Sequence, residues 1–282
     1  MKFRCIPRGF NLAKHPHFCR SLAELDLSNN LLEDLCPEIG CLTSLLNLQV
    51  SGNKLQHVTP GIAGLTNLTK LSLDLNKLKD LPEEIGDLQS LQRIWLDSNN
   101  LKGLPETFGL LTNLTELHVD HNGLYELCDS FSQLTGLKEL FLHNNSLGLD
   151  KLGEFGEVLA SAAGVPETLC ELPNLLALSL AANSLNEKLL PEKLSRLTNL
   201  TELWLNLNNF DQLPRQVCDL PKLRYVLMDI EVDTSQTTSD YFGQVAFPPE
   251  DFEEVALTKK KKGKAKESEK KQQLNKMMGK KT

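Results

Sequence analysis

Leucine recurs along this chain at fixed intervals, with polar residues between, and the whole pattern repeats every 23 residues. Each repeat carries Leu-x-x-Leu-x-Leu-x-x-Asn-x-Leu, and the first one runs from Leu22 to Leu32. Repetition this regular predicts one elongated stack of similar units. The nine copies begin at Leu22, Leu45, Leu68, Leu91, Leu114, Leu137, Leu175, Leu200 and Leu223.

The Leu-x-Leu centre of each copy alternates with period two, which predicts a short strand with one buried face. The chain then returns through a segment such as residues 81–88, where Pro82 can start a helical or 3₁₀ turn. No copy can bury its leucines alone, so the copies must stack strand beside strand. The predicted fold is an α/β solenoid of about nine repeats. It has a parallel sheet on its concave face and short helical segments on its convex face.

The Asn of the pattern is present in the first eight copies, and Glu231 replaces it in the ninth. An Asn side chain has both a donor and an acceptor. Because it stands where the chain leaves the strand, we expect it to bond backbone groups of its own turn and of the neighbouring copy. The ninth copy departs from the pattern as a terminal copy should, because its outer face meets water.

A Leu-Pro pair follows the Asn turn in several copies, as in Asn76-Lys77-Leu78-Lys79-Asp80-Leu81-Pro82. This unit resembles the intracellular leucine-rich repeats of the Ras-suppressor and plant Ras-group type, over about residues 22–231. The resemblance implies a leucine-rich repeat solenoid acting as a non-catalytic scaffold or adaptor in signal transduction. It also implies a protein partner such as a small GTPase or a phosphatase subunit. The pair is altered at Cys36, Thr59 and Cys128, which leaves the predicted fold unchanged.

The pattern divides the chain into four regions. An N-terminal cap is predicted at 1–21, the solenoid at 22–232, a C-terminal cap at 233–257, and a Lys-rich disordered tail at 258–282. Within the C-terminal cap, Phe247-Pro248-Pro249-Glu250-Asp251-Phe252 has the features of a helix start.

An insertion at about 148–164 interrupts the repeat, because Leu137 and Leu175 are 38 residues apart instead of 23. Apolar residues at Leu152, Phe155 and Val158 could form one side of a short helix, although Gly153 and Gly156 weaken that prediction. Insertions in repeat proteins emerge on the surface and often serve recognition. A tolerated insertion that packs on its own core is the equal alternative.

Charge is split between the two parts of the chain. Residues 258–282 hold eleven Lys and two Glu, a net charge of +9, and the whole chain carries −7, so residues 1–257 carry −16. Such a block predicts a solvated tail. It could also direct nuclear import or contact nucleic acid or anionic lipid. A factor that acts through this tail is the alternative to a scaffold.

Seven cysteines are scattered through the chain without a flanking cluster, which argues against a disulfide framework. The first residues have no apolar run of signal-peptide length, and no stretch approaches a membrane span. We therefore expect a cytoplasmic protein without integral membrane contact. It would also be nuclear if the tail acts as an import signal.

The residue between the second and third Leu of each copy should face outward from the sheet. Both tryptophans of the chain fall in this column, and Trp95, His118 and Phe141 occupy consecutive copies. Exposed aromatic side chains commonly mark an interaction surface. The alternative is that neighbouring rings only stack on one another. The column reads Asp26, Gln49, Ser72, Trp95, His118, Phe141, Ser179, Trp204 and Leu227.

Acidic residues border the aromatic column on both sides. Asp74, Asp97 and Asp120 lie two residues further along successive strands. Such a surface suits a basic or amphipathic protein segment and repels a nucleic-acid backbone. The predicted partner-binding residues are Arg93, Trp95, Asp97, Glu116, His118, Asp120, Glu139, Phe141, His143 and Trp204.

His118, Asp120 and His143 should converge, because alternate residues share a face and adjacent strands are close. Their types suit zinc or another transition metal, which would make a metal-dependent enzyme a third hypothesis. The spacing supplies no fourth ligand, no nucleophile and no Gly-rich phosphate loop. Paired carboxylates on an open face also have no pocket to shift their pKa. We therefore predict no catalytic residue, metal, cofactor or small-molecule substrate.

Overall fold

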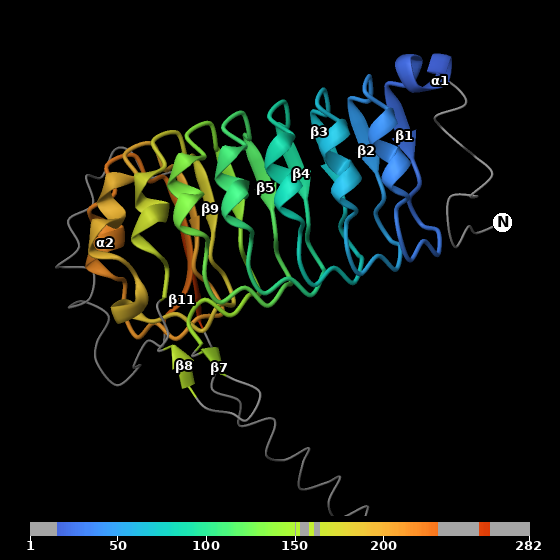
Figure 1. Cartoon of the computed structure of the whole chain (residues 1–282). Coiled ribbons are helices and arrows are strands. Elements are labelled where there is room, and N and C mark those ends of the chain that lie inside the picture. Colours follow the sequence, from blue (N-terminus) through green and yellow to red (C-terminus); the bar gives the residue numbers. More distant parts are fainter. Residues whose placement is uncertain (1–15, 150, 153–157, 161–163, 231–253, 260–282) are drawn as a thin grey trace, which may run out of the picture.

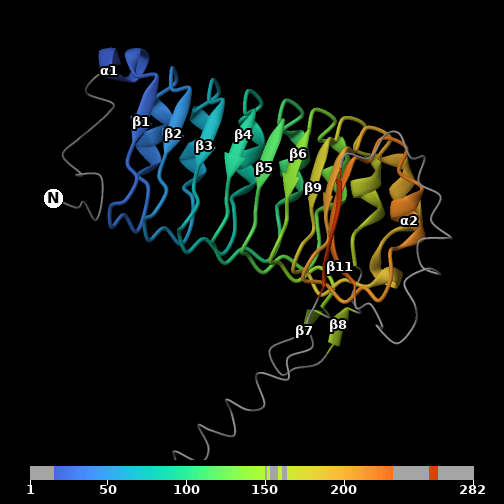
Figure 2. The ribbon, with the colours of Figure 1, turned by 180° about the vertical axis from the view of Figure 1, so that it is seen from behind.

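The computed structural model describes residues 16–149, 151–152, 158–160, 164–230 and 254–259. In these residues the repeats stack side by side, with strands along one face and short helices along the opposite face (Figures 1 and 2). Within the same ranges, no helix has the length and apolar character needed to cross a membrane.

Ten strands form one parallel sheet, and they follow one another in chain order. The first nine are the Leu-x-Leu centres of the nine copies, so the predicted leucine-rich repeat solenoid is confirmed. The strands are β1 (Glu24–Asp26), β2 (Asn47–Gln49), β3 (Lys70–Ser72), β4 (Arg93–Trp95), β5 (Glu116–His118), β6 (Glu139–Phe141), β9 (Ala177–Ser179), β10 (Glu202–Trp204), β11 (Tyr225–Ile230) and β12 (Glu254–Lys259).

The tenth strand, β12, comes from beyond the repeats. It pairs in parallel with β11 from Tyr225 opposite Glu254 to Ile230 opposite Lys259. It therefore crosses the boundary predicted between the C-terminal cap and the tail. The predicted helix start at 247–252 lies outside the described residues, as do residues 1–15 of the predicted N-terminal cap and residues 260–282 of the tail. Of that N-terminal cap, helix α1 (Pro16–Ser21) is described.

Short 3₁₀ helices cover the other face of the stack, and a proline begins or directly precedes most of them. Pro82, for example, precedes η4 with φ −70° and ψ 153°. Proline fixes φ and lacks the N–H that a first turn leaves unpaired, so the Leu-Pro pair sets the helix start. The helices are η2 (Pro37–Cys41), η3 (Pro60–Gly64), η4 (Glu83–Asp87), η5 (Glu106–Leu110), η6 (Asp129–Gln133), η7 (Glu167–Glu171), η8 (Glu187–Leu189), η9 (Glu192–Arg196) and α2 (Arg215–Cys218).

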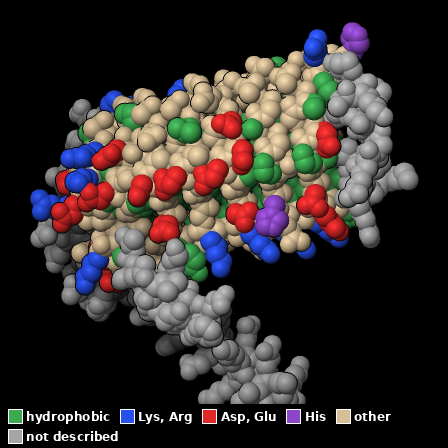
Figure 3. All heavy atoms as spheres, viewed as in Figure 1, with side chains coloured by type: hydrophobic (Ala, Val, Ile, Leu, Met, Phe, Trp, Pro, Cys, Tyr) green, Lys and Arg blue, Asp and Glu red, His purple; other side chains and the backbone are tan. Residues whose placement is uncertain are grey.

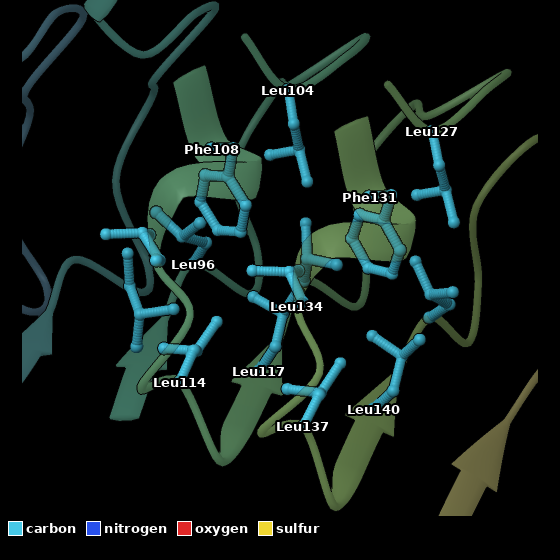
Figure 4. Close-up of a cluster of buried hydrophobic side chains, with 14 of the residues drawn as sticks. Leu96, Leu104, Phe108, Leu114, Leu117, Leu127, Phe131, Leu134, Leu137 and Leu140 are labelled. Carbon is cyan, nitrogen blue, oxygen red and sulfur yellow. The ribbon is translucent and has the colours of Figure 1, made fainter. Parts of the chain in front are cut away.

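The leucines of successive copies form one continuous core between the sheet and the helices. Leu117 and Leu140 on the strands are fully buried, as are Phe108 and Phe131 on the helices (Figure 4). In the first copy, by contrast, Leu25 is only partly buried. A terminal copy has a neighbour on one side only, so its leucines gain less from stacking.

From the second copy to the eighth, the Asn of the pattern ties two copies together, as the sequence predicts. The Asn99 side chain donates to the carbonyls of Leu73 (3.0 Å) and Leu96 (2.9 Å) and accepts from the Leu78 backbone N–H (2.9 Å). Asn53, Asn76 and their counterparts repeat this arrangement. The ladder satisfies buried backbone groups that the turns would otherwise leave unpaired.

The described part of the insertion is a two-stranded antiparallel ribbon of β7 (Lys151–Leu152) and β8 (Val158–Ala160). It lies at one edge of the stack, outside the large sheet (Figure 1). The predicted helix is therefore wrong for these residues. Glycine lowers helix stability, so Gly153 and Gly156 in the sequence disfavour one continuous helix through the insertion.

Candidate partner-binding face

Side chains on the strands that point away from the core form what we call the open face of the sheet. Five rings make an unbroken column across it, from β4 to β11. We call these rings the ring column. Its successive ring centroids are 6.1 Å apart for Trp95 and His118, 4.4 Å for His118 and Phe141, 6.2 Å for Phe141 and Trp204, and 5.8 Å for Trp204 and Tyr225.

A small residue in β9 allows the column to continue. Ser179 stands opposite Phe141 on one side and opposite Trp204 on the other. The two rings meet over it, and Ser179 is only 5% exposed. A larger side chain at this position would separate Phe141 from Trp204.

All five rings are half-buried rather than fully exposed. Each ring covers part of its neighbour, and ring pairs of this kind contribute about 0.5–1.5 kcal/mol beyond their buried area. Trp95, His118 and Phe141 therefore do stack on one another, as one of the two interpretations requires, whereas the two ring pairs of Trp204 are tilted. Each ring retains partial exposure. Tyr225 is the member that the sequence analysis missed. It lies two residues before Leu227, in the column that precedes the aromatic one, and it reaches Trp204 across the strand pair.

Carboxylates run beside the ring column at the ends of β3, β4 and β5. Asp74 and Asp97 are half-buried, and Asp120 is 5% exposed. We call these three the acid column. Burial raises the pKa of the Asp120 carboxyl to about 7 against the opposing effect of His118, and Asp97 adds to the rise. The pKa of Asp97 is also raised, first by burial and then by the charge of Asp74.

The structure brings His118, Asp120 and His143 together, as predicted. His143 Nδ1 lies 2.8 Å from Asp120 Oδ1, and His118 Nδ1 lies 3.9 Å from Asp120 Oδ2. Although Asp120 Oδ1 is close to His143, it is buried and receives no well-directed hydrogen bond from the described residues. Burial lowers the pKa of His143, and His121 and His118 lower it further. A buried carboxylate beside a neutral imidazole is poorly compensated, so added positive charge here would be favourable.

Of the other predicted residues, Arg93, Glu116 and Trp204 contact the ring column or belong to it, and Glu139 is exposed beside Glu116. Arg93 Nε lies 3.2 Å from Glu116 Oε2, and Glu116 Oε1 lies 2.9 Å from His118 Nε2, so these residues connect directly to the ring column. Glu139 is exposed on β6, beside Glu116 in the sheet register. Trp204 lies two strands from Phe141 and yet contacts it.

A metal site is not formed by these groups. Across the described ranges, no set of three or more His, Cys, Asp or Glu side chains is placed to hold a metal ion. One nitrogen of His118 lies at hydrogen-bonding distance from Glu116, and Asp120 lies between two imidazoles. The arrangement is an ion-pair and hydrogen-bond network on an open surface, which fits recognition better than metal chemistry.

Comparisons with known proteins agree with this architecture. A model described as leucine-rich repeat region matches residues 70–160, and a second leucine rich repeat model matches residues 20–78. Together with the nine stacked copies, these matches identify a leucine-rich repeat protein. Both matches are to the repeat class in general.

Among solved structures, a leucine-rich repeat protein of Leptospira interrogans is similar, with a TM-score of 0.67 and 29% identity over 82% of this chain and 59% of that one. The present chain thus spans about three fifths of that protein's length. An internalin (inlF) from Listeria monocytogenes matches with a TM-score of 0.48 and 24% identity, over 72% of this chain and 60% of the other. No curated protein sequence matches the chain.

Proposed function

We propose that this protein is a non-catalytic scaffold that binds a partner protein on the open face of its sheet. The observation that carries the proposal is the ring column, which keeps partial exposure over six strands of the sheet beside three carboxylates. Tryptophan and other aromatic side chains are frequent binding hot spots. Trp95, Phe141 and Trp204 would anchor the partner by burying their exposed ring surface, and the acid column would favour a basic partner.

The resemblance of the Leu-Pro repeat to the Ras-suppressor type supports a narrower version of this proposal. In that version the protein acts in intracellular signalling, and its partner is a small GTPase or a phosphatase subunit. Leucine-rich repeat proteins are generally interaction scaffolds, which supports the broader version. The alternative, a factor that acts through its Lys-rich tail, rests on the eleven lysines at 258–282. It predicts strongly salt-sensitive binding that deletion of the tail abolishes.

The test compares three full-length proteins as affinity baits in lysate from the source organism, read out by mass spectrometry. They are the wild type, the variant Trp95→Ala/Phe141→Ala/Trp204→Ala, and the control Leu110→Ala/Gln133→Ala/Glu171→Ala, whose positions are exposed on the helix side. We expect the ring variant alone to lose its main partners while circular dichroism shows all three folded. An unchanged partner list would contradict the proposal.

A further inference from the structure

In each of the first eight copies, the residue immediately before the Asn of the pattern adopts a left-handed backbone conformation. We call it the turn column. The turn column borders the open face beside the acid column. Leu75, for example, donates its backbone N–H to the backbone carbonyl of Asp97 in the next copy (2.9 Å). The members of the turn column are Asn29, Gly52, Leu75, Ser98, His121, Asn144, Ala182 and Leu207.

Leu75 and Leu207 are unsuited to this position on two counts. Their φ values are 54° and 59°, a region that glycine and asparagine tolerate and that a leucine side chain disfavours. Their side chains are also 58% and 61% exposed, so core packing does not compensate. Asn29, Gly52 and Asn144 show which residues the backbone prefers. Backbone conformation and exposure to water both disfavour leucine at these two positions. We therefore infer that Leu75 and Leu207 contact another segment.

The C-terminal segment of this chain begins beside the turn column. Lys259, the last residue of β12, is paired with Ile230, which follows the acid-column position of the ninth copy. Leu207 lies two strands from β12, roughly 10 Å away, and Leu75 lies seven strands away, roughly 34 Å. Residue 274 is 15 positions after Lys259 and can reach about 50 Å in extended form, which exceeds both distances.

Charge and composition match as well. Residues 260–282 hold ten lysines, and Asp74, Asp97 and Asp120 border the turn column. Asp120 in particular has a buried carboxylate oxygen, Oδ1, without a well-directed hydrogen bond from the described residues. The same segment carries Leu274, Met277 and Met278, which are apolar partners for an exposed leucine. Aliphatic lysine stems can cover a second leucine while their ammonium groups stay near the acids.

We propose that residues 260–282 dock along the turn column and acid column of their own chain. Lysines pair with Asp97 and Asp120, and apolar side chains cover Leu75 and Leu207. The segment would then occupy the edge of the open face, and a partner would have to displace it. This intramolecular contact is independent of whether the proposed function is correct.

The test uses a fluorescent synthetic peptide of residues 260–282 and two full-length proteins. One is the wild type, and in the other the ten lysines of 260–282 are replaced by glutamine. If the segment already occupies the site in its own chain, the peptide should bind the neutralised protein at least about tenfold more tightly than the wild type. Equal affinities would overturn the proposal. A wild type that sediments as a concentration-dependent dimer would also overturn it in favour of docking between two copies.

Matched variants in the neutralised protein locate the contact. Leu75→Asn/Leu207→Asn should weaken peptide binding about fivefold or more, whereas Ser98→Asn/Ala182→Asn, at equivalent left-handed positions, should change it less than about twofold. A second pair of variants tests the contribution of the carboxylates to peptide binding. Its control lies on the helix face, which also carries a row of acidic side chains (Figure 3). Asp97→Asn/Asp120→Asn should weaken binding more than Glu83→Gln/Glu106→Gln on that face. Equal losses within either pair would exclude a specific site.

Discussion

At the scale of single residues, Leu75 has a left-handed backbone conformation that a leucine side chain disfavours. Replacing it by asparagine in the neutralised protein, where residues 260–282 no longer dock, should raise the free energy of unfolding by about 0.5–1 kcal/mol, because asparagine tolerates φ near +54° better. Chemical denaturation of the two proteins measures the change. The control is Leu46→Asn, since Leu46 is 45% exposed without a left-handed backbone, and it should show no gain. Equal effects would mean that exposure rather than backbone strain decides stability here.

Asp120 predicts a pH dependence with a definite sign. Its folded pKa of about 7 lies above the ordinary 3.8, so the fold binds its proton more tightly than the unfolded chain does. The resulting stabilisation is complete below the unfolded pKa and is lost as pH rises through about 7. Between about pH 6.5 and 8.5 the neutralised protein, whose residues 260–282 carry no lysine, should lose about 1 kcal/mol relative to the same protein with Asp120→Asn.

Urea unfolding of both proteins across that range measures the difference. The window lies above the folded pKa of His143, which burial lowers from 6.5, so His143 stays neutral throughout. Parallel pH profiles for the two proteins would show that Asp120 is ionised in the fold throughout the range.

At the scale of elements, the asparagine ladder joins each turn to the turn beside it. Asn99→Ala would remove three hydrogen bonds between two copies and leave the Leu78 N–H without its partner. The carbonyls of Leu73 and Leu96 would keep one bond each, from the side chains of Asn76 and Asn122. We expect a loss of roughly 3 kcal/mol in unfolding free energy, measured by thermal or urea denaturation. Asn100→Ala is the matched control, because Asn100 is adjacent and exposed. A loss of the same size at both positions would argue against the ladder as the cause.

The elements also show what the sequence can and cannot predict. The 23-residue period fixes the register of the Leu-x-Leu strands, so it correctly placed Trp95, His118 and Phe141 on adjacent strands. The sequence did not indicate Tyr225, because the aromatic pattern lies between the second and third Leu of each copy and Tyr225 lies two residues earlier. Side chains in adjacent columns of neighbouring strands can nevertheless touch. The insertion and β12 lie outside the period, where local propensity alone gave a helix and no strand. Left-handed Leu75 opposes its own intrinsic preference, and its conformation could be predicted only from Asn29, Gly52 and Asn144 at the equivalent position of other copies.

At the scale of the whole molecule, stability is expected to be a sum over neighbouring copies. Leu117→Ala in the central β5 should cost about 3–4 kcal/mol, because Leu117 is fully buried between two copies. Leu25→Ala in the first copy should cost roughly half as much, since Leu25 is only partly buried. Equilibrium unfolding of both variants measures the difference. Equal losses would mean that the stack unfolds with no weaker end.

The central claim is that a partner protein occupies the open face of the sheet, and site-specific photo-crosslinking tests it most directly. A benzoylphenylalanine would be placed on the open face at Ser72 or Asn206, or on the helix side at Gln133 or Glu171. After irradiation in lysate from the source organism, we predict that the first two positions capture the same partner and the last two do not. Capture from the helix side alone would contradict the account.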